Sequence, residues 1–104
     1  MLKLTPTAAE QIRKSATEAD ASNMPLRIAV SLEDDGSFAY GMGFDERRDD
    51  DVHINTEGVQ IIFATRFKEA LMGAELDYVE LNPGEFRFIF RNPNDPAHTA
   101  PKSP

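Results

Sequence analysis

The sequence contains no cysteine, and this absence excludes several kinds of chemistry at once. Without thiols the chain can form no disulfide bond, no thiolate metal site and no cysteine nucleophile. Long apolar runs are also missing, since the longest is Ile61 to Ala64 whereas a bilayer-spanning helix needs about 20 apolar residues. The amino end, Met1 to Pro6, lacks the apolar region of a signal peptide. We therefore expect a cytoplasmic protein.

Basic residues are in deficit, with 11 Lys and Arg against 18 Asp and Glu and a net charge of -7. This charge repels phosphate backbones and anionic lipid surfaces, so neither nucleic acid nor a membrane is expected as a partner. Acidic side chains are densest in the segment from Asp45 to Asp51, which holds five acids and two arginines. We interpret this acidic loop as a solvated surface segment.

A length of 104 residues fits a single domain. Hydrophobic residues make up 40% of the chain and charged residues 28%, a balance typical of a folded protein. The carboxyl end differs, because four prolines from Pro93 onward and few apolar residues offer little to bury. We predict one domain over residues 1–94 and a disordered tail over residues 95–104.

Two segments carry helical patterns. Thr5 followed by Pro6 predicts a helix start, since threonine caps free N–H groups and proline suits the first helical position. Small and apolar residues then recur at helical spacing until Asn23 to Pro25 ends the helix. A second, short helix is predicted from Ala64 to Met72, because its apolar residues share one face and Gly73 follows it.

The rest of the chain alternates in the manner of strands. Apolar residues at every second position predict strands at Leu26 to Leu32, Phe38 to Phe44, Val52 to Ile54, Val59 to Phe63, Leu76 to Val79 and Phe86 to Arg91. Turn signals separate them, of which Asn82-Pro83-Gly84 is the strongest. The predicted fold class is therefore mainly β with two helices (α+β), arranged as a sheet sandwich or irregular barrel with the helices packed outside.

Few residues form a recognisable catalytic or metal-binding pattern. Asp49, Asp51 and His53 alternate, so an extended segment could place three hard-metal ligands on one side. An EF-hand reading fails, because Ile54 stands where the loop needs glycine. No serine has a base at a spacing typical of a hydrolase. We accordingly predict no catalytic residue, no cofactor and no enzyme activity.

Several short motifs occur in a characteristic order along the chain. They are Ala39-Tyr40 after the first hairpin turn, Leu76-Asp77-Tyr78-Val79, and Phe88-x-Phe90-x-Asn92-Pro93-Asn94. In this order and spacing the sequence resembles the A-type iron–sulfur carrier family, also called HesB-like, over about residues 2 to 101. The resemblance implies a HesB-like fold for the predicted sandwich or barrel.

The resemblance also implies where cluster ligands would stand. The family is known for one cysteine just before the Ala-Tyr pair and a Cys-x-Cys pair shortly after Asn-Pro-Asn. The matching positions here are Asp35, Thr99 and Pro101. A carboxylate suits hard cations, a threonine hydroxyl is a poor ligand and a proline side chain is none, whereas iron–sulfur clusters take thiolates.

A protein with this scaffold and without its cysteines is expected to act through contacts. The resemblance implies an interaction or regulatory role in intracellular sulfur oxidation or iron–sulfur protein biogenesis, with a protein partner and a monomer or weak dimer as the assembly. An alternative stays open, in which the chain carries iron or another hard metal. Its ligands would be the carboxylates of Asp49 and Asp51 in the acidic loop, together with Asp35 and His53.

Overall fold

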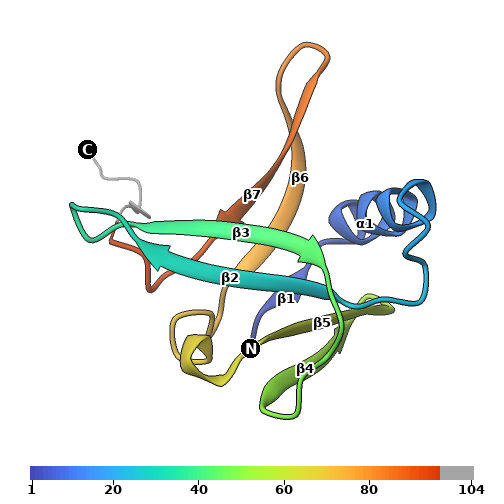
Figure 1. Ribbon diagram of the computed structural model, residues 1–104. Coiled ribbons are helices and arrows are strands. Elements are labelled where there is room, and N and C mark those ends of the chain that lie inside the picture. The colour runs from blue at the N-terminus through green and yellow to red at the C-terminus, as the bar shows by residue number, and fades with distance from the viewer. Residues whose placement is uncertain (97–104) are drawn as a thin grey trace.

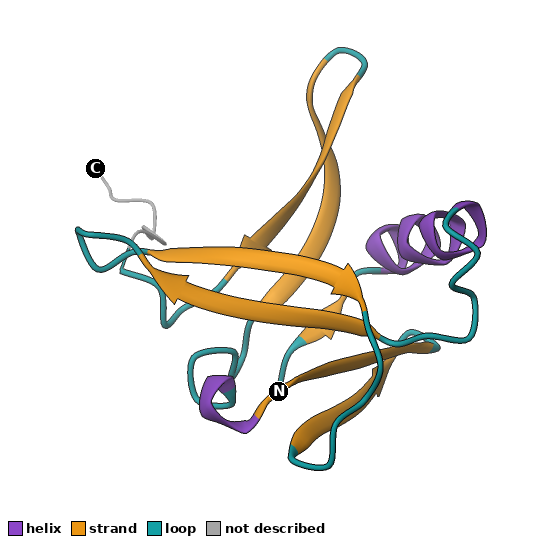
Figure 2. Cartoon of the chain, viewed as in Figure 1, coloured by secondary structure: helices purple, strands orange, loops and turns teal. Residues whose placement is uncertain are grey.

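In a computed structural model of the chain, residues 1–96 are described and form two β-sheets and one α-helix (Figure 1, Figure 2). In chain order the elements are β1 (Lys3–Leu4), α1 (Pro6–Glu18), β2 (Leu26–Leu32), β3 (Phe38–Phe44), β4 (Asp51–Thr56), β5 (Val59–Ala64), the 3-10 helix η1 (Thr65–Phe67), β6 (Glu75–Asn82) and β7 (Glu85–Arg91). The predicted mainly β fold is confirmed.

The strands divide into a four-stranded sheet of order β3-β2-β5-β4 and a three-stranded sheet of order β1-β6-β7. Neighbours are antiparallel except for two parallel pairs, β2 with β5 and β1 with β6. Figure 1 shows the β6–β7 hairpin extending away from the rest of the molecule. Both sheets keep free edges, so the strands of residues 1–96 do not close into a barrel.

Helix α1 begins as its sequence predicts. The Thr5 hydroxyl accepts a hydrogen bond from the Ala8 N–H at 3.1 Å, and Pro6 occupies the first helical position. The buried residues of the helix lie on one face, which contacts β1, β5 and β6. They are Ala8, Ala9, Ile12 and Ala16. The small side chains let this short helix approach the sheets closely.

The predicted second helix from Ala64 to Met72 is wrong. Only Thr65–Phe67 is helical, as a 3-10 turn, and turns lead from there to Gly73 at φ 78°. This stretch is short for a helix, whose nucleation is costly. The Ala70 and Met72 carbonyls accept hydrogen bonds from asparagine side chains that follow β7. These bonds fix the turns in place.

Strand β1 was not predicted, because two residues are too few to show alternation. It is held by parallel pairing, with Lys3 opposite Glu75 and Leu4 opposite Leu76. Leu2 and Leu4 are both buried. The amino end of the chain thus forms an edge strand of the three-stranded sheet and contributes Leu2 and Leu4 to the core.

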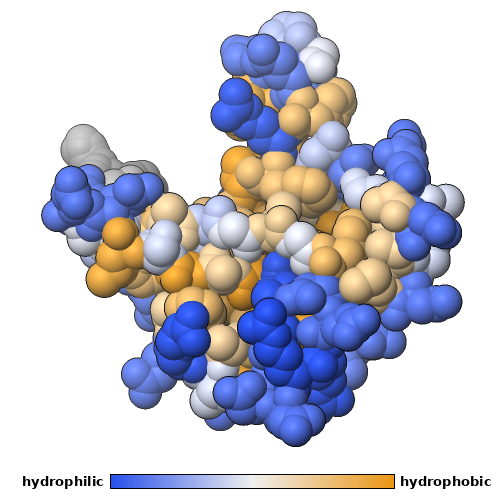
Figure 3. All heavy atoms as spheres, in the orientation of Figure 1, coloured by the Kyte–Doolittle hydropathy of each residue, from blue (hydrophilic) through white to orange (hydrophobic). Residues whose placement is uncertain are grey.

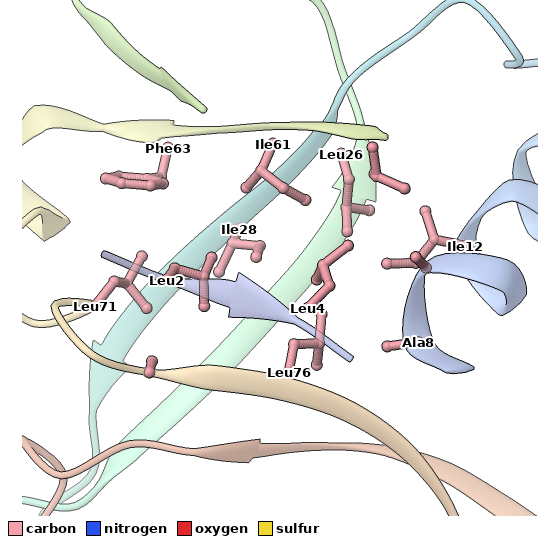
Figure 4. Close-up of a cluster of buried hydrophobic side chains, with 13 residues drawn as sticks. Leu2, Leu4, Ala8, Ile12, Leu26, Ile28, Ile61, Phe63, Leu71 and Leu76 are labelled. Atoms are coloured by element: carbon pink, nitrogen blue, oxygen red, sulfur yellow. The ribbon is translucent and has the colours of Figure 1, made fainter. Parts of the chain in front are cut away.

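The core lies between the two sheets and the inner face of α1, as the close-up in Figure 4 shows. Its fully buried side chains come from α1, β2, β5, β6 and the turns before β6. The largest apolar ones are Phe63, Ile28, Ile61, Leu71 and Leu76. Burying each such side chain contributes about 1.5–3 kcal/mol. The alternation seen in the sequence therefore reports which face of each strand meets this core.

Candidate functional site

The chain just after β7, which leads toward Thr99 and Pro101, contacts the start of β3, just after the turn that holds Asp35. Asp95, which follows β7, accepts a hydrogen bond from the Phe38 N–H at 3.1 Å, and the Tyr40 hydroxyl lies 3.4 Å from its other oxygen. Phe38 and Tyr40 stand just after the β2–β3 turn. The Tyr40 ring stacks on Phe90 at a centroid distance of 3.9 Å. The folded part of the chain therefore reaches at least to Asp95.

Asp35 occupies the β2–β3 turn and is already engaged there. Its Oδ1 accepts hydrogen bonds from the Ser37 hydroxyl at 2.6 Å and from the Ser37 N–H at 2.9 Å. These two bonds, the hydroxyl first, hold the pKa of this carboxyl below its usual value. Such a side chain-to-backbone contact is an ordinary turn-stabilising use of aspartate.

The other two matching positions, Thr99 and Pro101, lie outside the described residues, as does the part of the predicted 95–104 tail from residue 97 onward. Their identities still decide what chemistry is available. One carboxylate, one hydroxyl and one proline do not fit an iron–sulfur cluster, which requires soft thiolate donors. The donor set at these three positions is therefore incompatible with the cluster that the scaffold implies.

Asn92 explains the Asn-Pro-Asn motif structurally. This side chain is 1% exposed, and its Nδ2 donates to the Ala70 carbonyl at 2.7 Å and to the Tyr40 hydroxyl at 3.2 Å. Its Oδ1 accepts from the Asn94 N–H at 3.0 Å. Asn92 thus joins the turns before β6 to β3 and to the segment after β7. The motif supports the architecture around the two loops and supplies no ligand.

The composition of the acidic loop Asp45 to Asp51 suggested a solvated surface segment. In the structure both ends of this loop are instead bound by an arginine side chain. Arg27 on β2 binds both of its ends: Nε donates to Asp45 at 2.6 Å, while Nη1 and Nη2 donate to the two oxygens of Asp51 at 2.9 and 2.6 Å. The Asp51 side chain is 2% exposed. Its bonds with Arg27, and then with the Arg48 N–H, lower its pKa from 3.8 to about 2.

The alternative hard-metal set is not brought together. Asp51 is committed to Arg27, which contacts it near the start of β2, whereas Asp35 lies in the turn beyond the far end of that strand. At least five residues of β2 lie between Arg27, which holds Asp51, and the turn that holds Asp35, a distance on the order of 15–20 Å. His53 lies 3.3 Å from the Arg47 guanidinium, where a cation would be repelled. No group of three or more potential metal ligands occurs within residues 1–96, Asp49 included.

Comparisons with known protein sequences identify a family and several relatives. Residues 1–98 match the protein family described as iron-sulphur cluster biosynthesis. The chain is 36% identical over 94 residues to the iron-sulfur cluster insertion protein ErpA of Xylella fastidiosa strain M12, covering 89% of this chain and 73% of that protein. It is 35% identical to ErpA of Stenotrophomonas maltophilia, with 89% and 72% covered.

Solved structures show the same fold. A crystal structure of IscA with its [2Fe-2S] cluster superposes with a TM-score of 0.77 at 28% identity, over 89% of this chain and 86% of that one. Escherichia coli SufA, involved in biosynthesis of iron-sulfur clusters, gives 0.72 at 27% identity over the same shares. A solution structure of a protein from Aquifex aeolicus gives 0.67 at 36% identity, with 88% and 91% covered.

The chain therefore belongs to the iron-sulphur cluster biosynthesis family, with an IscA-like fold. The comparisons confirm the family that the sequence motifs indicated. Of the proteins named in these comparisons, ErpA is a cluster insertion protein and IscA was solved with its [2Fe-2S] cluster. In the part of the chain that the structure describes, no helix is long and apolar enough to span a membrane.

Proposed function

We propose that this chain is a non-catalytic member of the family that has lost cluster chemistry and works by binding a protein partner. The observation that carries the proposal is the complete absence of cysteine from a chain that keeps the family fold. A fold does not by itself imply its relatives' activity, which resides in the site residues grafted onto it. Here those residues are Asp35, Thr99 and Pro101.

In lacking these cysteines the chain resembles DsrR, a cysteine-free A-type-like protein encoded with sulfur-oxidation genes in purple sulfur bacteria. That resemblance is the basis for proposing a role in intracellular sulfur oxidation, with iron–sulfur protein biogenesis as the related process suggested by the rest of the family. Either role would place the protein in the cytoplasm.

Exposed apolar side chains support a role in partner binding. Leu81 and Phe86, near the tip of the β6–β7 hairpin, are 54% and 52% exposed. The Tyr78 ring stacks on Phe86 at a centroid distance of 5.6 Å and contacts Phe88 in a tilted arrangement at 4.7 Å, so an aromatic row follows this hairpin outward. Figure 3 shows apolar side chains gathered where the hairpin leaves the body. Because the chain carries a net charge of -7, the partner should present apolar side chains within neutral or basic surroundings.

Anaerobic reconstitution tests the loss of cluster chemistry. Incubation with ferrous iron and sulfide, followed by desalting, should leave the protein colourless because it offers no thiolate. The matched positive control is a cysteine-bearing relative such as ErpA of Xylella fastidiosa, treated in the same way. Stoichiometric protein-bound iron and sulfide with charge-transfer absorption would overturn the proposal.

Affinity capture from native cells tests the partner. The wild-type protein should recover a sulfur-oxidation or iron–sulfur biogenesis protein that a Leu81→Ser/Phe86→Ser variant recovers at least about tenfold less. Met72→Ser is the matched control, since Met72 is 46% exposed but lies outside the hairpin. If the hairpin variant recovers the same proteins in the same amounts, the hairpin is not the partner surface. If wild type recovers none above a blank resin, the interaction role is wrong.

A further inference from the structure

A cavity of about 250 Å³ lies between α1, the loop that follows it and the β4–β5 turn. Figure 1 shows the loop after α1 passing the tip of the β4–β5 hairpin. The cavity is on the opposite end of β2 from Asp35, so it is separate from the two loops discussed above. Its volume is just below the range of about 300–1,000 Å³ that is typical of drug-sized ligand sites, and so suits a smaller molecule.

The cavity has one apolar side and one polar side. Ile12, Phe44 and Val59 contribute apolar surface that belongs to or packs on the core. Arg13, Asn23 and Gln60 contribute polar groups from three different elements. An apolar wall with a few convergent polar groups is the usual composition of a small-molecule site, in which the polar groups orient the ligand.

Arg13 is held in place at this cavity by one hydrogen bond. Its Nη1 donates to the Glu57 carbonyl at 2.9 Å. Glu57 and Gly58 both have positive φ values, 53° and 78°, so the two-residue turn directs that carbonyl toward the helix. A Cβ at Gly58 would lie 3.7 Å from the same Nη1, so the guanidinium rests against the turn backbone.

The remaining donors of Arg13 make no hydrogen bond to residues 1–96. Within residues 1–96 no carboxylate forms an ion pair with this guanidinium, although acids outnumber bases in the chain. Nε and Nη2 are therefore available for a planar, two-oxygen acceptor, which a guanidinium binds through two parallel hydrogen bonds. The net charge of -7 opposes anion binding only weakly here, because salt screens charges beyond about 8 Å at physiological ionic strength.

We propose that this cavity binds a small organic carboxylate with a compact apolar body. The carboxylate pairs with Arg13, while the apolar part lies on Ile12, Phe44 and Val59. The guanidinium and the apolar wall select this class of ligand together. An inorganic anion would leave the apolar wall in contact with water. A neutral apolar molecule would provide no hydrogen-bond acceptor for the guanidinium. The site is independent of the proposed partner role and of any cluster chemistry.

Titrations with phenylacetate and 4-methylpentanoate, followed by amide chemical shifts, test the proposal. Saturable shifts should be confined to residues near Asn23 and Gln60, and acetate should bind at least about tenfold more weakly because it lacks the apolar body. Phenylacetamide, which has the same shape without the charge, should also bind at least about tenfold more weakly.

Arg13→Gln should weaken phenylacetate binding at least about tenfold, with the amide spectrum verifying that the variant is folded. Lys14→Gln is the matched control: it removes the same charge from the next helical residue, which does not line the cavity, and should leave affinity unchanged. Absence of saturable shifts with both carboxylates, equal binding of phenylacetamide, or equal binding by the Arg13→Gln variant would each overturn the proposal.

Discussion

Arg27 on β2 and Asp51 at the start of β4 form a two-point contact, with Nη1 donating to Oδ1 at 2.9 Å and Nη2 donating to Oδ2 at 2.6 Å. The same guanidinium donates to Asp45 through Nε, so one side chain closes the acidic loop at both ends. With Arg27 at 16% and Asp51 at 2% side-chain exposure, water competes little for these bonds. The loop is therefore held in a defined shape.

The first prediction concerns acid stability. The bond with Arg27, followed by that with the Arg48 N–H, lowers the pKa of Asp51 from its ordinary 3.8 to about 2 in the fold, so the stability it contributes is fully present above about pH 4 and is lost as pH falls through about 2. Asp51→Asn should therefore be less stable than wild type at about pH 6, and the difference should shrink as the pH is lowered toward 2. Urea unfolding followed by circular dichroism at several pH values measures this.

Asp50→Asn provides the matched control for the acid experiment. It removes a neighbouring carboxylate whose side chain has no hydrogen bond or ion pair within residues 1–96. Its stability should follow wild type across the same pH range. If Asp51→Asn shows a constant difference from wild type at all pH values, the ion pair does not contribute through the charge of Asp51.

The second prediction concerns the buried amide of Asn92. Asn92→Ala removes the shorter of two hydrogen bonds to the Ala70 carbonyl, which Asn94 Nδ2 also reaches at 3.2 Å, and it takes away the acceptor of the Asn94 N–H in a partly buried setting. We expect a loss of about 3 kcal/mol in the free energy of unfolding. Thermal and urea unfolding measure this loss.

Asn82→Ala is the control for Asn92, because the Asn82 side chain is exposed and, within residues 1–96, forms one hydrogen bond, to Glu85 in its own hairpin. This change should stay within about 0.5 kcal/mol of wild type. Equal losses in the two variants would mean that Asn92 does not organise the turns before β6.

The third prediction concerns the start of α1. The Thr5 hydroxyl accepts from the Ala8 N–H and donates to an Asp77 oxygen at 2.7 Å, which links the helix to β6. Thr5→Ala should cost about 2 kcal/mol, since it removes both the helix cap and a bond to a carboxylate. Thr5→Ser keeps the hydroxyl and should cost less than about 1 kcal/mol. If the two variants are equally destabilised in urea unfolding, the hydroxyl is not the stabilising group.

The fourth prediction restores cluster binding. The Phe38–Asp95 bond holds the segment after β7 beside the β2–β3 turn, and four residues of extended chain reach about 13–14 Å. A protein with Asp35→Cys, Thr99→Cys and Pro101→Cys should therefore take up an iron–sulfur cluster under anaerobic reconstitution, measured by visible absorption and iron content. Thiolate–metal binding, on the order of 10 kcal/mol, exceeds the cost of ordering a few residues at about 1–2 kcal/mol each.

Asp35→Cys alone is the control for this experiment and should remain colourless, because one thiolate cannot hold a cluster. A folded triple variant that also stays colourless would show that the two loops do not present their side chains as the cluster-binding relatives do. Such a result would not affect the proposal that the natural chain has lost cluster chemistry.

Local patterns were sufficient to predict most elements of the fold. The alternation of Leu26 to Leu32 and Phe38 to Phe44 marks β2 and β3 because each strand has one face on the core. Thr5 and Pro6 mark the helix start because capping depends on neighbouring residues alone. The segment Ala64 to Met72 was mistaken for a helix, since the asparagines that hold its carbonyls are more than 20 residues away in sequence.

The site was harder to predict for the same reason. The motifs identified the family, and with it the three positions that have lost their cysteines. They did not show that Arg27 would bind Asp51, because no local pattern joins residues that β2 and β4 bring together across β5. Arg13 likewise looks like an ordinary exposed helix residue until the β4–β5 turn is placed beside it.

The parallel pairing of β1 with β6 affects how the chain can fold during synthesis. Leu4 finds its neighbour only when Leu76 has left the ribosome, and translation at about 5–20 residues per second delays that by roughly 4–14 seconds. Until then Leu2 and Leu4, which the finished protein buries, stay accessible on the nascent chain. The amino-terminal segment is thus available to chaperones and proteases during translation, and its protection is among the last events of folding.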